Sequence, residues 1–116
     1  MRLPDAELAR VDRRKITAYL LNPAHRYGAS KARFLEAFGF QVERWEVFAR
    51  ALREHALRYE VARSQESEFG LRYDVDGPLE APDGRWPRVR VVWQRDWLAP
   101  APRLITAYPL EDEEHD

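Results

Sequence analysis

The chain has 116 residues, the length of one modest domain, and it contains no cysteine. The lack of cysteine excludes disulfides, thiolate chemistry and zinc sites built on sulfur. Hydrophobic residues make up 45% and charged residues 34% of the chain, which indicates a folded domain rather than a disordered one. No apolar run is long enough to span a membrane, and the N-terminus lacks a signal-peptide pattern. We therefore expect a cytoplasmic protein without a membrane segment.

The charge is distributed unevenly along the chain. The net charge is −1, but the last six residues, EDEEHD, contain five acids and neither Lys nor Arg. Without them, residues 1–110 hold 19 basic against 15 acidic residues, a net charge of +4. We expect a single domain over residues 1–110 and an acidic disordered tail over residues 111–116. Such a tail could also compete with a polyanion for the basic body.

Two short helices are predicted in the first third of the chain. Asp12 is a plausible N-cap for a helix that reaches about residue 21, in which Ile16, Tyr19 and Leu20 form an apolar stripe. A second helix is predicted to begin near Ser30, which would cap it. It ends at Gly39, where a left-handed C-cap is expected.

The third predicted helix is the longest and covers about residues 42–62. Its apolar residues recur at alternating spacings of three and four, which places them on one helix face. These residues are Val42, Trp45, Ala49, Leu52, Ala56 and Tyr59, with Phe48 widening the stripe.

In the C-terminal half, apolar residues recur at every second position, which indicates strands. Alternation over 69–77, 88–96 and 103–110, with an APDG turn at 81–84, predicts three or four antiparallel strands joined as a meander. The predicted fold is therefore an α+β domain, with three N-terminal helices packed on a C-terminal antiparallel sheet.

Several stretches resemble known families. The segments YLLNPAH, KARF, YDVDGPL, VRVVW and RLITAYPL are similar, with their neighbours, to a small bacterial domain-of-unknown-function family across nearly the whole chain. The layout also resembles the metal-independent ribonuclease toxins of the barnase–EndoU–colicin–RelE superfamily. Many of those toxins place a His and a Lys in an N-terminal helical part and close with a strand reading TAYP or TAFP. The matching elements here are His25, Lys31 and the ITAYP of residues 105–109.

This second resemblance implies cleavage of RNA by attack of the ribose 2′-hydroxyl on the adjacent phosphorus. The reaction needs a base, an acid and a cation or hydrogen-bond donors around the phosphorane. Histidine titrates near neutrality, so His25 suits proton transfer, and Lys31 would add positive charge near a helix N-terminus, where anions bind. Thr106 and Tyr108 alternate along the last strand, so their hydroxyls share one face and are the other candidate catalytic groups.

The same resemblance suggests partners for the chain. Arg72, Arg88 and Arg90 lie at outward-facing strand positions and are candidates for binding the RNA backbone. Trp86 and Trp97 flank turns and could stack on a base, although packing in those turns is the simpler interpretation. A toxin of this kind would be inhibited by a small antitoxin or immunity protein.

Other interpretations remain open on the sequence alone. A lone loop histidine is commonly a locally hydrogen-bonded group. Of the other two histidines, His55 is expected to pack within or beside its helix, and His115 lies in the acidic tail. The chain could therefore be an inactive interaction partner in a two-gene toxin–antitoxin module, or a nucleic-acid-binding domain without chemistry. No metal site and no nucleotide cofactor are expected, because the sequence shows neither ligand spacing nor a phosphate-binding glycine motif.

Overall fold

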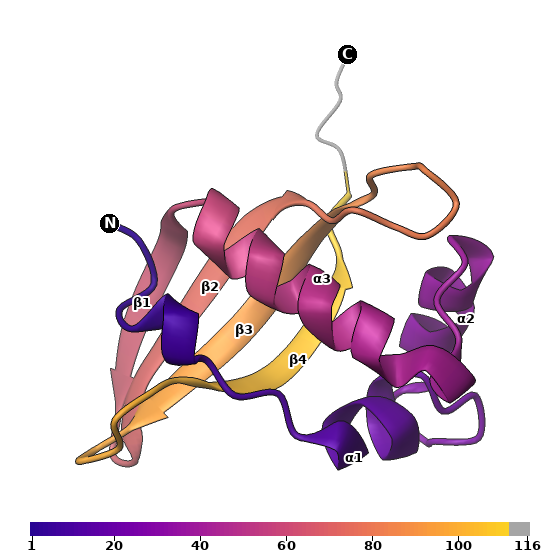
Figure 1. Cartoon of the computed structure of the whole chain (residues 1–116). Coiled ribbons are helices and arrows are strands. Elements are labelled where there is room, and N and C mark those ends of the chain that lie inside the picture. Colours follow the sequence, from indigo (N-terminus) through magenta and orange to yellow (C-terminus); the bar gives the residue numbers. More distant parts are fainter. Residues whose placement is uncertain (112–116) are drawn as a thin grey trace.

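The chain folds as helices followed by a four-stranded antiparallel sheet, seen in the computed structural model in Figure 1. The structure describes residues 1–111, so His115 and most of the predicted acidic tail, residues 112–116, lie outside the described residues. Strand order in the sheet equals chain order, and each strand is antiparallel to its neighbour. The predicted α+β class and meander are confirmed. The strands are β1 (Val61–Ser67), β2 (Gly70–Pro78), β3 (Arg88–Asp96) and β4 (Arg103–Pro109).

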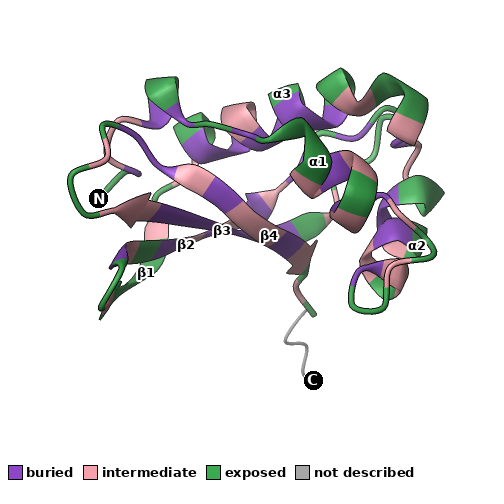
Figure 2. Cartoon of the chain, turned by 90° about the horizontal axis from the view of Figure 1, so that it is seen from below, coloured by how far each residue is buried: buried purple, intermediate pink, exposed green. Residues whose placement is uncertain are grey.

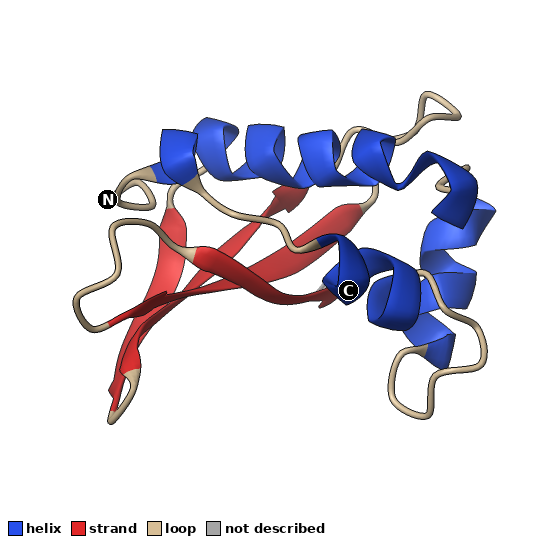
Figure 3. Cartoon of the chain, turned by 60° about the horizontal axis from the view of Figure 1, so that its bottom comes forward, coloured by secondary structure: helices blue, strands red, loops and turns tan. Residues whose placement is uncertain are grey.

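The helices lie on one side of the sheet and at one end of it. The longest, α3, crosses one sheet face in Figures 1 and 3, whereas Figure 2 shows the opposite face without a covering layer. Within residues 1–111, no helix has the length and apolar character needed to cross a membrane. In chain order the helical elements are η1 (Ala6–Leu8), α1 (Arg13–Lys15), η2 (Ile16–Leu20), α2 (Ala29–Ala37), η3 (Val42–Arg44) and α3 (Trp45–Arg58).

One hydrophobic core joins the covered sheet face to the helices. The apolar stripe of α3 is buried as its spacing predicts, and the inward residues of β2 and β3 belong to the same cluster. Trp93 on β3 has none of its surface exposed and is the largest buried side chain. The main members contributed by these elements are Phe48, Leu52, Ala56, Val75, Val91 and Trp93. The predicted Asp12 cap is also observed, because its carboxylate accepts the Arg14 amide at 2.9 Å.

The end of the third helix differs from the prediction. The helix stops at Arg58 rather than near Ala62, and Tyr59 is extended with φ −116° and ψ 155°. Val61 then begins β1, a strand that the sequence did not indicate. The reason is that β1 is an edge strand and almost wholly exposed, so it lacks the alternation of apolar and polar residues that marks a half-buried strand.

His55 is buried between α3 and the sheet. Its side chain has none of its surface exposed, its Nε2 lies 3.0 Å from the Gly77 carbonyl oxygen, and its ring packs edge-on against Tyr59 at 4.9 Å. Because a carbonyl only accepts, Nε2 carries the proton. Burial lowers the pKa of His55 from 6.5 to about 4, against the opposing effect of the Gly77 hydrogen bond. His55 is therefore a neutral core residue at physiological pH.

We predict that the fold loses stability as the pH falls from 6.5 to 4. In this window the unfolded chain binds a proton at His55 that the folded chain does not, so the free energy of unfolding falls with pH. A shift of this size corresponds to about 3 kcal/mol. Urea unfolding of the wild type and of His55→Gln, which does not titrate here, measures the difference. Equal losses in the two proteins between pH 7 and pH 4 would contradict the prediction.

Candidate active site

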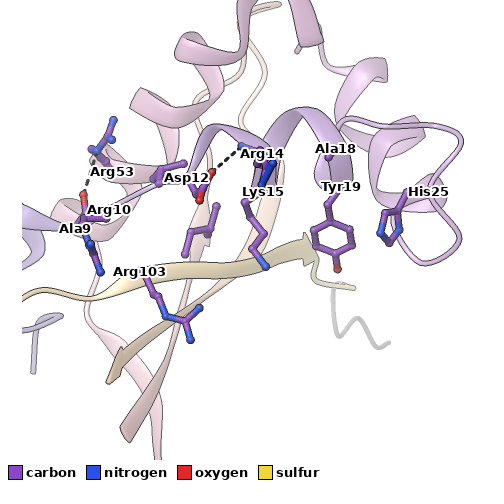
Figure 4. Close-up of a pocket in the computed structure, with 12 residues that line it drawn as sticks. Ala9, Arg10, Asp12, Arg14, Lys15, Ala18, Tyr19, His25, Arg53 and Arg103 are labelled. Atoms are coloured by element: carbon purple, nitrogen blue, oxygen red, sulfur yellow. Dashed lines mark hydrogen bonds between the residues drawn. The ribbon is translucent and has the colours of Figure 1, made fainter. Parts of the chain in front are cut away.

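A groove of about 830 Å³ runs beside the N-terminal segment, α1, η2 and the start of β4 (Figure 4). The N-terminal segment is held along the edge of β4, because the Arg10 amide donates to the Pro102 carbonyl and the Leu104 amide donates to the Arg10 carbonyl, both at 2.9 Å. The lining has an excess of positive charge, with the carboxylate of Asp12 and five cationic side chains, of which Arg103 is paired with Asp96 at 2.8 Å. The cationic residues are Arg10, Arg14, Lys15, Arg53 and Arg103. Such a surface attracts a polyanion.

Tyr19, at one end of this groove, belongs to a π-helical turn. The turn is η2, in which the Leu21 amide donates to the Ile16 carbonyl five residues earlier at 2.8 Å. Turns of this kind occur frequently at functional sites. The predicted apolar stripe is only partly observed: Ile16 and Leu20 are fully buried, whereas Tyr19 is half-buried and directs its hydroxyl toward β4.

Four polar groups meet at the Tyr19 side chain. Its hydroxyl lies 3.0 Å from Thr106 Oγ1, and either oxygen can donate this hydrogen bond. The His25 ring contacts the Tyr19 ring edge-on, with 4.9 Å between centroids. The ammonium groups of Lys15 and Lys31 lie 5.5 and 5.6 Å from the centroid of the same ring. Three of the predicted catalytic residues, His25, Lys31 and Thr106, are thus gathered around a residue that the prediction did not include.

Backbone amides orient His25 in its loop. Its Nδ1 accepts hydrogen bonds from the Tyr27 and Gly28 amides, each at 3.0 Å. Since an amide only donates, Nδ1 is unprotonated and the neutral ring carries its proton on Nε2. A Cβ on Gly28 would overlap the Tyr19 carbonyl oxygen, so only glycine lets the loop approach η2 this closely. His25 therefore presents an N–H group from a fixed loop.

The start of α2 is organised by this loop rather than by Ser30. The helix begins at Ala29 with Gly28 as N-cap, and no side chain caps it, so the predicted cap by Ser30 is wrong. Lys31 lies in the first turn and its Nζ donates to the Tyr27 carbonyl at 3.2 Å. Its ammonium group is turned back toward the loop and Tyr19.

Thr106 and Tyr108 share one face of β4, as their alternation predicted. Thr106 pairs across the sheet with Val92, and Tyr108 pairs with Arg90. A register irregularity next to Thr106 leaves Ile105 without a cross-strand partner. Thr106 joins the Tyr19 cluster through its hydroxyl, whereas Tyr108 lies opposite Arg90 on the neighbouring strand.

The three predicted RNA-binding arginines lie on the open sheet face, and two of them have partners within it. Arg90 makes a two-pronged ion pair with Asp76, at 2.8 and 2.9 Å. This ion pair, followed by the influence of the Tyr108 hydroxyl, raises the pKa of Arg90 above its ordinary value. Arg72 donates to the Gln94 side-chain oxygen at 2.8 Å, whereas Arg88 is exposed at the start of β3. The open face therefore neutralises part of its own charge.

The groove residues were missed because no local pattern marks them. Tyr19 sits at an apolar-stripe position, and isolated arginines in a chain with 17 of them carry no positional signal. Lys15 offered the best clue, since it is one of two lysines in the chain and ends α1 immediately before η2. Residues 1–111 hold no cluster of three or more His, Cys, Asp or Glu side chains arranged as metal ligands.

Comparisons with known proteins give a family and a fold. The sequence model described as "Domain of unknown function (DUF6883)" matches residues 2–111, which confirms the resemblance to a family of that kind. No curated protein matches the chain significantly. Among solved structures, the chain is similar to one from a contact-dependent growth inhibition toxin–immunity protein complex of Klebsiella pneumoniae 342. The TM-score is 0.68 at 13% identity, covering 86% of this chain and 98% of that one, so the likeness shows a shared fold.

We predict that His25→Ala destabilises the protein while His25→Asn largely preserves its stability. Asparagine can accept the Tyr27 and Gly28 amides through Oδ1, as it does in turns and helix caps. Alanine leaves both amides without this acceptor, at a cost of about 1 kcal/mol. Urea unfolding measures the difference, with Ser30→Ala as a nearly neutral control. If both His25 variants match the wild type, the amide contacts do not stabilise the loop.

Proposed function

We propose that this chain, which belongs to the family of the domain of unknown function DUF6883, is a metal-independent endoribonuclease that acts as a toxin domain. The observation that carries the proposal is the meeting of His25, Lys31 and Thr106 at Tyr19, where the groove ends. A substrate phosphate at this point would contact proton-transfer groups and fixed positive charge together. The groove would bind the RNA backbone next to that phosphate.

The proposed reaction is attack of a ribose 2′-oxygen on the adjacent phosphorus. The phosphorus–5′-oxygen bond breaks, leaving a 2′,3′-cyclic phosphate and a 5′-hydroxyl. The attacking hydroxyl gives up one proton and the leaving oxygen takes up one. We assign this transfer to the Tyr19–Thr106 hydroxyl pair, because either hydroxyl can donate the hydrogen bond between them. One oxygen can then accept the proton of the 2′-hydroxyl as its own proton passes along the hydrogen bond and the other hydroxyl releases a proton to the leaving oxygen. The pair thus returns to its starting state.

His25 and the two lysines would stabilise charge in this reaction. With Nδ1 held by two amides, His25 is suited to donate from Nε2 to a phosphate oxygen rather than to remove a proton. Lys15 and Lys31 both lie close to the Tyr19 ring and would neutralise the charge that develops on the phosphorane. Donors that are already oriented act without reorganising during the reaction, which is why a fixed loop matters.

The path of the RNA backbone follows from the distribution of charge. The groove leads directly to Tyr19 and His25, which both line it, so we propose that Arg10 and Arg14, whose side chains form no ion pair within residues 1–111, bind successive phosphates. On the open sheet face, Arg88 is better placed than Arg72 or Arg90 to add a phosphate contact, because those two already have partners. Tyr108 is proposed to support the site from the neighbouring position of β4.

The proposed cognate inhibitor is a small antitoxin or immunity protein. The structural neighbour comes from a toxin–immunity protein complex, which makes such a partner a reasonable proposal for this chain. The same likeness supports the alternative that this chain is an inactive interaction partner in a two-gene module. The arrangement around Tyr19 favours the enzyme, since interaction alone does not require these groups to meet.

We predict that the purified protein cleaves mixed cellular RNA in EDTA and leaves fragments ending in a cyclic phosphate. Tyr19→Phe, His25→Asn, Lys31→Ala and Thr106→Val should each reduce the rate about 100-fold, the usual contribution of a proton-transfer or charge-stabilising group. Gel analysis and end-group mapping measure the outcome.

Tyr59→Phe is the matched control, because it removes a phenolic hydroxyl beside His55 rather than in the groove. The control should retain wild-type activity. RNA that stays intact with folded, partner-free protein would support the interaction-partner alternative. Cleavage only after addition of a divalent metal ion would refute the proposed mechanism.

A further inference from the structure

Tyr27 is an exposed aromatic residue whose backbone is held on both sides. Its side chain is 66% exposed. Its amide donates to His25 Nδ1 at 3.0 Å, and its carbonyl accepts from Lys31 Nζ at 3.2 Å. The two residues that the proposed function places at the phosphate therefore also fix the position of Tyr27.

Much of the Tyr27 side chain remains accessible beside its two nearest charged and aromatic neighbours. The Arg26 guanidinium lies over the ring, 5.3 Å from its centroid. The His25 ring is tilted toward it, with 6.2 Å between centroids. Because the side chain is still two-thirds exposed with these neighbours in place, a second flat group has room to stack. An exposed aromatic ring on a fixed backbone gains little stability for the fold, yet it can bind a ligand with little loss of side-chain entropy.

We propose that Tyr27 is a stacking platform for a nucleobase of single-stranded RNA. The inference rests on the proposed function for the nature of the ligand. The His25 ring neighbours both the Tyr19 and the Tyr27 ring, so a phosphate at the Tyr19 cluster would have Tyr27 close enough to receive a neighbouring base. Base–aromatic stacking is tolerant of sequence and requires an unpaired base, because the bases of a duplex are stacked on one another. The site would therefore select unpaired RNA.

Other exposed aromatic residues lack this position. Trp86 lies under the Arg58 guanidinium at 5.0 Å, and Trp97 donates its indole N–H to the Glu68 carbonyl at 2.9 Å. Phe69 is 65% exposed at the turn between β1 and β2. None of the three lines the groove or contacts the Tyr19 cluster within the described part of the chain. Phe69 is thus a suitable control for loss of an exposed ring.

The test is an abasic scan with short, labelled 2′-O-methyl oligonucleotides, which lack the attacking hydroxyl and cannot be cleaved. Fluorescence anisotropy measures Kd for the intact oligonucleotide and for versions with one base removed at each position. In the wild type, removal of one particular base should weaken binding about tenfold, within the usual range for stacking on an aromatic side chain. Tyr27→Ala should weaken the intact oligonucleotide by a similar factor and abolish the effect of that base.

Tyr27→Phe and Tyr27→Trp should retain wild-type binding, and Phe69→Ala should not change it. A duplex of the same sequence should bind less tightly than the single strand. The inference is overturned if Tyr27→Ala binds like the wild type, if the abasic effect persists in Tyr27→Ala, or if no oligonucleotide binds. If Tyr27→Ala both binds and cleaves RNA like the wild type, the stacking site is refuted and the proposed enzyme is not. An abasic effect at one position that disappears in Tyr27→Ala, without any RNA cleavage by the wild type, would support the stacking site and refute the proposed enzyme.

Discussion

The pairing of the N-terminal segment with the edge of β4 is the interaction on which the candidate site depends. Order β1-β2-β3-β4 leaves one edge of β4 unpaired by any other strand, and Arg10 occupies part of that edge through two backbone hydrogen bonds of 2.9 Å. This contact places α1 and η2 beside β4, which brings Tyr19 to Thr106, 87 residues away in sequence. It also protects an edge that would otherwise be open to pairing with other chains.

The two faces of the sheet differ in composition. The face under α3 is filled with apolar side chains around Trp93 and supplies most of the core. The open face carries charged residues on adjacent strands, and these pair with each other: Arg90 with Asp76, and Arg103 with Asp96 at 2.8 Å. Arg103 also lines the groove beside β4, whereas the other four cationic side chains of the groove form no ion pair within residues 1–111. Charge pairing is therefore more complete on the open face than in the groove.

The two described histidines show how local surroundings assign roles to the same side chain. His55 is enclosed, donates through Nε2 to the Gly77 carbonyl, and has its pKa lowered by burial. His25 is half-buried, and its Nδ1 accepts two amides, which leaves Nε2–H directed to other partners. A backbone carbonyl in one case and backbone amides in the other select the proton position. Structural and functional interpretations of His25 are compatible, because the amide contacts that stabilise the loop also orient the ring.

The sequence by itself determined the local elements of this protein. The 3–4 spacing of α3, the alternation in β2, β3 and β4 and the Asp12 cap depend on residues a few positions apart, so they were predicted correctly. The exposed strand β1 and the end of α3 at Arg58 were decided by pairing with β2, which no local pattern records. Likewise, only tertiary structure brought Tyr19 and the groove arginines to β4, because contacts between distant residues depend on packing and on strand order. The identity of the residues was visible in the sequence, whereas their meeting was a property of the fold.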